Sequence, residues 1–533
     1  MGIKEIDADV LVVGSGLAGV MAAVKAARMG CTVVLASKGS MRSGNSVLVG
    51  GGWLVPSKDF PPDEYVHVTL EGGKRINDVK LLRVLGQRGE AMMRVLGEMG
   101  VPLEKRSNRM WWVKMDTGKR SAGIVLMDPL LEHTKDERIV VLPWLSIIEL
   151  LMDDGRASGA VGISRDMGPV VIDAKSVVLA TGGGGGIYKR HDNHRRTRGD
   201  GYWLALQVGL PLRDMEFVQF YPLGLAEPHL PPLMVPPPIP KEGKAIDSEG
   251  QDIVEKHGLR FDLNEFIMEY RDQLTLILTT ETERGKVYLD YTGVPEEKWE
   301  TPRLNRFGRI NPASRNRPFA VAPVVHFFMG GVEINEFAQT AIPGLFAAGE
   351  VTAGVHGANR IGGNALMECA VFGDIAGESA ALYAMGVRRG KSKRGAVPGK
   401  FLWKEERKEV KELFLEVQDL TWTHAGPIRN GQSLQEGLSR VPEMEERLLE
   451  LEADGKSLEL NEVKGSVLIS KAIMRASLER EESRGAFYRE DFPQSDDDHW
   501  LKNIFLSLNG KTGDFIVTHR PAEGTELTDI IQP

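Results

Sequence analysis

The pattern of apolar and polar positions changes period twice at the start of the chain. Residues 10–13 are a short β-branched apolar run, residues 20–29 repeat small and apolar side chains at helical spacing, and residues 31–36 form a second apolar run. A glycine-rich segment, residues 14–19, separates the first run from the helical segment. The pattern predicts a strand, a tight turn, a helix and a second strand.

The turn has the form GxGxxG, in the context that this motif needs to bind the pyrophosphate of a dinucleotide. Gly14 permits the tight turn, Gly16 lets a pyrophosphate approach the backbone, and Gly19 lets the helix pack on the strand, while the helix N-terminus faces the phosphates. The alternative is a glycine turn in an ordinary α/β unit that binds nothing, and the order of elements disfavours it. We expect cofactor contacts along the whole turn: Gly14, Ser15, Gly16, Leu17, Ala18 and Gly19.

The segment after the second strand favours a flavin. The strand ends in Ser37-Lys38, where an acidic residue usually holds the adenosine ribose, and a glycine- and hydroxyl-rich loop follows. A basic loop of this kind suits a second pyrophosphate cradle and a flavin better than a nicotinamide. We predict FAD, contacted here by Ser37, Lys38, Ser43, Gly44, Asn45, Gly51 and Gly52.

Further along, residues 80–99 carry apolar side chains on one helical face, which predicts a helix that covers the core. We expect strands over 138–142, 157–164 and 170–173, which together resemble the β-meander of two-dinucleotide flavoproteins. Another strand then runs into Ala-Thr-Gly-Gly, a recurrent mark of FAD folds. Thr181 and Gly182 should therefore lie beside the nucleotide.

Asp200 begins the segment DGYWLALQVG, which we predict to be helical. A carboxylate at a helix N-terminus is favoured by the helix dipole, so Asp200 is a cap. The same carboxylate could also reach the cofactor, and the residues leave both interpretations open.

The character of the chain changes between residues 226 and 316. Residues 231–240 contain six prolines and cannot form a central strand or a helix interior. A helix is expected around residues 271–284. We predict a separate, smaller domain over the flavin, with a rigid surface loop or partner-binding segment as the alternative for the proline-rich stretch.

After residue 316 the strand pattern returns. Residues 323–332 and 343–350 read as strands, and residues 355–366 lead into a helix that continues to about residue 385. Backbone donors at the start of that helix suit an anionic flavin ring or a carboxylate, so cofactor contacts are expected at Glu350, Asn364, Ala365 and Leu366. Residues 388–394 form a basic linker, and residues 401–480 predict amphipathic helices with a break at 425–427.

Composition limits the function classes. The chain has 533 residues, of which 42% are apolar and 26% charged, and its formal net charge of -8 argues against nucleic acid as a partner. Cys31 and Cys369 are the only cysteines and cannot ligate an iron–sulfur cluster alone, so a cluster would belong to another subunit. With no visible signal peptide or long apolar run, we expect a cytoplasmic protein that reaches a membrane only through a partner.

Several motifs in one order resemble the flavoprotein subunit of succinate dehydrogenase and fumarate reductase, with L-aspartate oxidase as a close relative. They are MEFVQFYPLG at 215–224, HFFMGGV at 326–332, GLFAAGE at 344–350, HGANRIGGNAL at 356–366 and SRGAFYREDFP at 483–493. The resemblance implies an α/β fold with a Rossmann-like FAD-binding domain in two segments (1–225 and 317–390). It also implies an inserted α+β capping domain (226–316) and a C-terminal helical domain and tail (400–533).

The resemblance also implies a reaction. A hydride moves between flavin N5 and a carbon next to a carboxylate, and an arginine of the capping domain exchanges the proton. Arg360 in HGANR matches the carboxylate-binding arginine, His326 its partner histidine, and Arg271 the proton-exchanging arginine. Tyr221 occupies the position of a substrate-binding histidine. An iron–sulfur electron-transfer subunit is the implied partner.

The chain departs from the family at several positions. Gly44 stands where many members have a histidine joined covalently to FAD, so we expect non-covalent FAD. Leu223 replaces a threonine, and residues 236–243 replace a segment that normally supplies a threonine, a glutamate and an arginine. The clamp for a second carboxylate is missing or rebuilt, with Lys241 and Glu242 as candidates for a new proton path. We therefore expect a substrate with one carboxylate or carbonyl and a less polar remainder.

Two other functions remain open from the sequence. One is an electron-transfer flavoprotein subunit without its own organic substrate, favoured by the altered loop and disfavoured by the retained Arg271, His326 and Arg360. The other is an amino-acid oxidase like L-aspartate oxidase, which the altered clamp disfavours.

Overall fold

A parallel sheet lies at the centre of the nucleotide-binding part of the protein. The computed structural model describes residues 3–115, 120–235, 237–260, 262–388, 401–403 and 407–523, so most of the predicted linker at 388–394 and Pro236 of the proline-rich stretch lie outside it. The parallel strands are β6 (Ile139–Pro143), β2 (Val33–Ser37), β1 (Lys4–Val13), β9 (Gly168–Leu179) and β16 (Leu345–Ala347), in that order. With α1 (Leu17–Arg28) between β1 and β2, the predicted strand–turn–helix–strand unit is confirmed.

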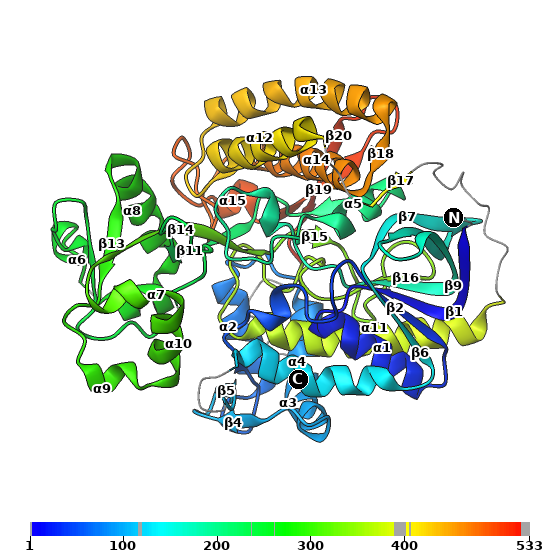
Figure 1. Ribbon diagram of the computed structural model, residues 1–533, viewed down its shortest axis with the longest axis horizontal. Helices are drawn as coiled ribbons and strands as arrows, with labels where there is room; N and C mark the ends of the chain where they lie inside the picture. The colour runs from blue at the N-terminus through cyan, green and yellow to red at the C-terminus, as the bar shows by residue number, and fades with distance from the viewer. Residues whose placement is uncertain are drawn as a thin grey trace.

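Two helices pack closely under this sheet (Figure 1). α11 (Asn364–Gly386) lies along α1, and small residues make the contact possible. A Cβ atom at Gly373 would lie 2.5 Å from the Ala18 carbonyl oxygen, and one at Gly377 would lie 2.3 Å from that of Ala22. Glycine at these two positions therefore sets the spacing that holds the helix pair against the sheet.

The β-meander is built differently from the prediction. It consists of β7 (Leu145–Asp153), β8 (Arg156–Ser164) and the first half of β9, all antiparallel. The expected first strand, residues 138–142, is instead β6 and pairs in parallel with β2. The two strands expected on either side of residue 174 are one strand, β9. Apolar periodicity identifies a strand but not its partner, and this is why the assignment was wrong.

A second hydrophobic core lies apart from the first and appears at the left of Figure 1. Its sheet has the order β11 (Val218–Leu225), β14 (Phe319–Phe328), β13 (Val287–Asp290), β12 (Lys244–Ile246). The helices are α6 (Ile253–Lys256), α7 (Leu263–Glu269), α8 (Arg271–Arg284), α9 (Glu296–Trp299) and α10 (Pro302–Ile310). We call this α+β unit, residues 221–324, the cap.

Strands β11 and β14 connect the two cores. Val218 and Phe220 on β11 pack in the main core, whereas Tyr221, next along the same strand, packs in the cap. On β14, Val325 belongs to the main core and Val324 to the cap. Residues near this crossover therefore lie where the cap meets the rest of the protein.

The C-terminal region contains the predicted helices and, in addition, strands. α12 (Lys408–Ala425), α13 (Gly431–Asp454) and α14 (Leu458–Glu479) form a bundle, and the break after residue 425 is confirmed. The segment beyond the predicted helices, expected only as a tail, contains the short helix α15 (Asp497–Trp500) and two strands. There β19 (Lys502–Leu508) and β20 (Phe515–Pro521) form a hairpin that joins β10 (Leu212–Arg213) and β15 (Gly331–Val332).

A buried ionic cluster attaches this region to the base of β11. Arg480 donates to Glu216 over 2.7 Å and to Glu482 over 2.8 Å, and all three side chains are fully buried. Arg484 pairs with the same Glu482. The motif SRGAFYREDFP, recognised in the sequence, contributes to this cluster through Arg484.

The remaining elements cover the first core. They are β3 (Gly52–Leu54), β4 (Leu103–Lys105) and β5 (Met110–Val113), which form a small antiparallel sheet, and α2 (Pro62–Gly72), α3 (Val79–Glu98), α4 (Ala122–Glu132) and α5 (Asp200–Gln207). The predicted helix at 80–99 is α3, and its apolar face is buried as expected. Among the described helices, we find none that is both long and apolar enough to cross a membrane.

Candidate active site

One large cavity runs from the glycine turn after β1 to the cap. Its volume is about 1690 Å³, whereas small-molecule sites usually measure about 300–1,000 Å³, so a dinucleotide and a second molecule both have room. The cavity is lined by all four predicted catalytic residues, Tyr221, Arg271, His326 and Arg360. The predicted cofactor residues on its wall are Gly14, Ser15, Gly16, Leu17, Ala18, Ser37, Lys38, Ser43, Gly44, Asn45, Gly51, Gly52, Thr181, Gly182, Asp200, Glu350, Ala365 and Leu366.

Two predicted cofactor residues lie behind the cavity wall. A Cβ atom at Gly19 would lie 1.9 Å from the Gly14 carbonyl oxygen, so Gly19 serves the packing of the helix on the turn. The buried Asn364 accepts a hydrogen bond from the Tyr65 hydroxyl (3.0 Å) and donates one to Thr69 (3.2 Å). The Asn364 side chain is thus used within the protein, and its contact with a cofactor stays a prediction.

The glycine turn has the geometry of a pyrophosphate cradle. Gly14 has φ +116°, and a Cβ atom there would lie 2.1 Å from the Ala180 carbonyl oxygen, so no other residue fits. Ser46 accepts a hydrogen bond from the backbone N–H of Leu17 at 2.9 Å and thereby fixes the loop against the start of α1. Thr181 Oγ1 is buried on the cavity wall without a partner among the described residues. These features fit a bound FAD, whose pyrophosphate would lie against the turn.

Lys38 is held by two carboxylates from distant parts of the chain. Its ammonium group lies 2.9 Å from Asp200 and 3.1 Å from Glu462 on α14, and it also donates to the Arg196 carbonyl. Burial by itself would raise the pKa of Glu462, but Lys38 and Arg198 beside it lower the pKa overall. Asp200 therefore does more than begin a helix. Glu462 was missed from the sequence because only the fold brings it to Lys38, which lines the cavity.

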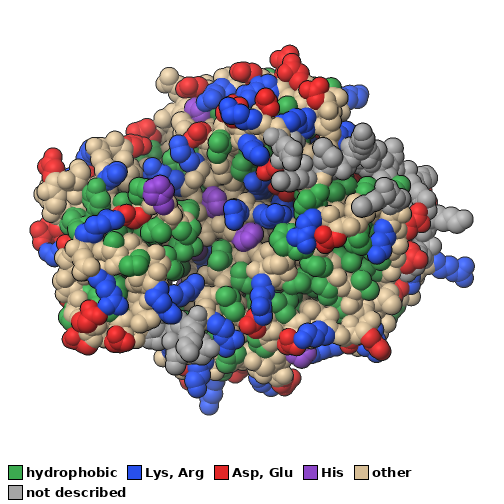
Figure 2. Space-filling view, viewed as in Figure 1, with side chains coloured by type: hydrophobic (Ala, Val, Ile, Leu, Met, Phe, Trp, Pro, Cys, Tyr) green, Lys and Arg blue, Asp and Glu red, His purple; other side chains and the backbone are tan. Residues whose placement is uncertain are grey.

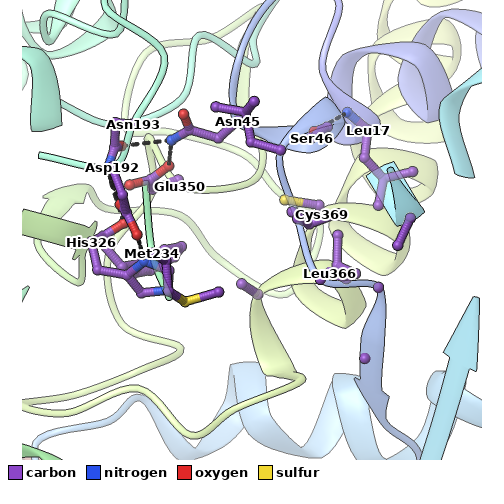
Figure 3. Close-up of a pocket in the computed structure, with 18 of the residues that line it drawn as sticks. Leu17, Asn45, Ser46, Asp192, Asn193, Met234, His326, Glu350, Leu366 and Cys369 are labelled. Carbon is purple, nitrogen blue, oxygen red and sulfur yellow. Dashed lines mark hydrogen bonds and ion pairs between the residues drawn. The ribbon is translucent and has the colours of Figure 1, made fainter. Parts of the chain in front are cut away.

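A hydrogen-bonded group surrounds Asn45 (Figure 3). The Asn45 amide donates to Asn193 at 2.7 Å and to Glu350 at 3.2 Å, and its oxygen accepts from the backbone N–H of His194 at 2.9 Å. Glu350 also accepts from the backbone N–H of Phe328. Burial raises the pKa of Glu350 to about 7 despite these donors. The group fixes the loop that follows Gly44, the position without a nucleophilic side chain.

The histidine at the crossover between the cap and the main core has one nitrogen in use. His326 Nδ1 lies 2.7 Å from Asp192 Oδ2. Figure 3 shows the two side chains facing one another. The described residues offer no partner for His326 Nε2. Its ring packs against that of Tyr221, with 5.9 Å between the ring centroids. The Asp192 contact fixes the orientation of the ring, so that Nε2 remains available for a ligand.

Two guanidinium groups line the same cavity as this histidine and form no ion pair with a carboxylate in the described part of the chain. Arg271, the first residue of α8, donates to the Arg360 carbonyl at 2.9 Å and to Asn359 at 3.3 Å, and its Nε is buried without a partner. Arg360 is buried over the ring of Phe327, and its Nε also lacks a partner.

The environment of these two arginines disfavours their charge. Burial and the nearby Arg271 lower the pKa of Arg360 to about 9, and burial lowers the pKa of Arg271. A bound carboxylate would favour the charged form of both arginines, because it would lie as an opposite charge next to each guanidinium group.

Tyr221 lines the cavity, but its hydroxyl is already engaged. It donates to the Val235 carbonyl oxygen at 2.8 Å, so the expectation that it donates to substrate is not supported in this arrangement. Lys241 and Glu242 do not line the cavity, and Glu242 pairs with Lys298, which does. The cap side of the cavity is mostly apolar: it is lined by Leu225, Leu233, Met234, Pro237, Pro238, Ile239, Pro240, Ile267, Leu304, Phe307 and Ile310.

Fold and cavity together define an FAD-binding oxidoreductase, and comparisons with known proteins narrow the class. The family model for the FAD binding domain matches residues 9–366, and the model for the fumarate reductase flavoprotein C-terminus matches residues 415–533. The chain therefore belongs to the fumarate reductase and succinate dehydrogenase family of flavoproteins.

Similar proteins agree with this assignment over almost the whole chain. A subunit of the fumarate reductase (CoM/CoB) of Methanothermobacter marburgensis is 34% identical over 94% of this chain and 97% of that protein. L-aspartate oxidase of Pyrococcus furiosus is 31% identical over 94% of this chain and 99% of that protein. Among solved structures, Sdh1 of Mycobacterium smegmatis superposes with a TM-score of 0.86 at 26% identity, covering 99% of this chain and 96% of that one. FrdA of Escherichia coli quinol fumarate reductase superposes with a TM-score of 0.83 at 26% identity, covering 97% of this chain and 97% of that one.

Proposed function

We propose that the chain catalyses reversible hydride transfer between FAD and a C–C bond next to a carboxylate or carbonyl group. Bound FAD supplies the hydride chemistry through its ring. Arg360 and His326 bind the carboxylate, and Arg271 exchanges the proton on the neighbouring carbon. The observation that supports this assignment is the pair of neighbouring guanidinium groups without a carboxylate partner among the described residues.

The roles of these side chains follow from their chemistry. A buried cation next to a substrate carboxylate withdraws electron density from the adjacent double bond, which favours attack of a hydride on it. The imidazole Nε2 of His326 can add a hydrogen bond because Asp192 fixes the ring. Burial lowers the pKa of Arg271, which is the direction that a proton donor requires.

The cap side of the cavity supports a substrate with a less polar remainder. Met234, Pro237 to Pro240 and their neighbours make this side of the cavity mostly apolar. We infer that a second carboxylate of fumarate would lie against these walls. Each unsatisfied polar contact there would cost about 1–3 kcal/mol. A monocarboxylic or thioester enoate avoids this cost, whereas fumarate and aspartate do not.

FAD is bound non-covalently in this proposal, because Gly44 carries no side chain that could be joined to the flavin and nothing lies within 4 Å of a Cβ built there. The protein also acts as one component of a larger redox complex, with an iron–sulfur protein as the electron-transfer partner. This part is supported by the relatives, one of which is named as a subunit of a fumarate reductase and another as a chain of quinol fumarate reductase.

The test is an anaerobic reoxidation experiment. The flavin of the purified FAD-loaded protein is reduced, and its absorbance is followed after addition of fumarate, monocarboxylic enoates or thioester enoates. We expect faster reoxidation by a monocarboxylic or thioester enoate than by fumarate. Rapid reoxidation by fumarate would refute the argument from the apolar wall. If no enoate reoxidises the flavin, the enzyme proposal fails and an electron-transfer subunit without its own organic substrate is favoured.

Variants of α8 test the role of Arg271. Arg271→Lys should lower the reoxidation rate by roughly 10²–10⁴-fold, the usual contribution of a positioned proton donor. Arg284→Lys, at the exposed other end of the same helix, is the matched control and should leave the rate unchanged. Equal rates in the two variants would remove Arg271 from the mechanism.

Oxygen consumption with aspartate would instead support an oxidase.

A further inference from the structure

The cavity lining is positively charged although the protein as a whole is acidic. Ten Lys and Arg residues and five Asp and Glu residues line it, whereas the whole chain has a formal net charge of -8. The pyrophosphate of FAD and one substrate carboxylate use only part of this excess. The remaining cations come from the cap and from the region of the small β3–β5–β4 sheet, and not from the glycine turn. Lys and Arg side chains also appear near the middle of the face drawn in Figure 2.

Three cations at this end have carboxylate partners and three do not. Arg106 pairs with Glu104, Arg109 with Glu64, and Lys298 with Glu242. For Lys114 and Arg306, which also line the cavity, the described residues provide no hydrogen-bond or ion-pair acceptor to the side chain. Lys74 forms no ion pair with a described residue, but it lies near Asp272 and favours the charged form of that carboxylate. The unpartnered cations come from both sides of the cavity: Arg306 from α10 of the cap, and Lys114 from the residue after β5.

We propose that the substrate carries a second anionic group, a carboxylate or phosphate, at the far end of an apolar chain, and that Arg306 and Lys114 bind this group. The inference deepens the proposed function and rests on it for the position of the reacting end. The inner carboxylate or carbonyl lies at Arg360 and His326, and the apolar chain lies along the wall that includes Leu304 and Phe307.

Two observations support this arrangement. Leu304, Phe307 and Ile310 share helix α10 with Arg306, so apolar wall and terminal cation belong to one element. Arg306 is half-buried, and burial and the nearby Arg309 lower its pKa, so an anion would relieve an unfavourable environment.

The same terminal chemistry has two possible sources. A long-chain unsaturated dicarboxylic acid carries the second anion itself. An acyl thioester of a phosphorylated carrier, such as coenzyme A, carries it on the carrier. Both have an acyl group at one end and a strong anion at the other.

Binding of unreactive saturated ligands tests the inference without turnover. Octanoate and octanedioate are titrated into oxidised FAD-loaded protein, and the dissociation constants are measured from the change in flavin absorbance. We expect octanedioate to bind roughly tenfold more tightly, as one charge-assisted hydrogen bond implies. The difference should disappear at about 1 M salt, where the Debye length is only about 3 Å. Octanoyl-CoA and octanoyl-pantetheine form a second pair that tests the phosphorylated carrier.

Variants locate the site. Arg306→Gln and Lys114→Gln should remove most of the preference for the ligand with the terminal anion and leave octanoate binding unchanged. Arg309→Gln, on the same helix but outside the cavity lining, is the control and should retain the preference. The inference is supported if the protein prefers octanedioate to octanoate, or octanoyl-CoA to octanoyl-pantetheine, and if Arg306→Gln loses that preference. Equal affinities within both ligand pairs, or a preference unaffected by Arg306→Gln, would overturn it.

The two proposals fail separately. If the saturated ligands bind as expected but no enoate reoxidises the flavin, the proposed reaction is refuted and the anion site is not. Enoates that reoxidise the flavin with no effect of a terminal anion would refute the anion site alone.

Discussion

Arg360 is a buried cation that forms no direct ion pair with the described residues, and this has a cost that can be measured. Burial, and after it the nearby Arg271, lower its pKa to about 9, a shift that corresponds to about 5 kcal/mol at about 1.4 kcal/mol per unit. The cation–π contact with Phe327 recovers about 2 kcal/mol, because the pair is desolvated. Arg360→Met keeps most of the side-chain volume and removes the charge, so we expect the variant to be more stable than the parent protein by several kcal/mol.

Thermal unfolding of the FAD-loaded protein measures this effect. For a chain of 533 residues, each kcal/mol shifts Tm by about 1 °C, so an increase of about 2–4 °C is expected. Binding of carboxylates should be lost in the same variant. The control is Arg429→Met. Arg429 is also buried, but it donates to the Gly426 and Glu216 carbonyls and to Ser477, so its removal should lower Tm.

The pH dependence follows from the sign of the shift. Because the pKa of Arg360 is lower in the folded protein than in the unfolded chain, the cost is fully present below pH about 9 and decreases as pH rises above it. The stability difference between variant and parent should therefore shrink above pH about 9. A decrease in Tm for Arg360→Met, similar to that for Arg429→Met, would refute the view that Arg360 is kept for binding rather than for stability.

Three further predictions concern the cofactor loop and the cap. Gly14→Ala should abolish FAD binding, measured as the flavin content of the purified protein, because its Cβ would overlap a backbone oxygen; Gly30→Ala, also at positive φ but with open space around it, should retain FAD. Tyr221→Phe should lower the free energy of unfolding by about 1 kcal/mol, because the hydrogen bond to the Val235 carbonyl is lost. It should change kcat/KM for monocarboxylic enoates by less than about threefold, and a larger loss would indicate that Tyr221 donates to the substrate. The pKa of Glu350 rises from 4.5 to about 7, so its contribution to stability is greatest at low pH and is lost as pH rises through 7; Glu350→Gln should gain up to about 3 kcal/mol relative to the parent at pH 8 and little at pH 5, and an equal gain at both would contradict this titration.

The local elements of this fold could be predicted from the sequence because they depend on neighbouring residues. The turn at Gly14, the helix α8 and the break after Ala425 each follow from a short pattern of small, apolar and polar residues. Strand partners could not be predicted in the same way. Residues 138–142 and the hairpin β19–β20 pair with strands that lie far away in the sequence, and periodicity carries no information on partners.

The candidate site shows the same division. His326, Arg360 and Arg271 were found through motifs, and the structure brings them to one cavity. The bond from Tyr221 to Val235 and the contact of Glu462 with Lys38 were missed, because each depends on the path of a loop or helix that no motif marks. Arg306 was missed for a different reason: an arginine on an amphipathic helix is usually at the surface, and only the cavity shows otherwise.

The two ion pairs of Lys38, with Asp200 and with Glu462, also have a consequence for the synthesis of the protein. The lysine leaves the ribosome early, Asp200 follows 162 residues later, and Glu462 comes only with α14. Until that helix is synthesised, the lysine beside the nucleotide cradle lacks one of its two counter-ions. The cofactor site therefore cannot be completed before α14 is synthesised, and a nascent chain stalled before α14 would present a cradle with different charge from that of the finished protein.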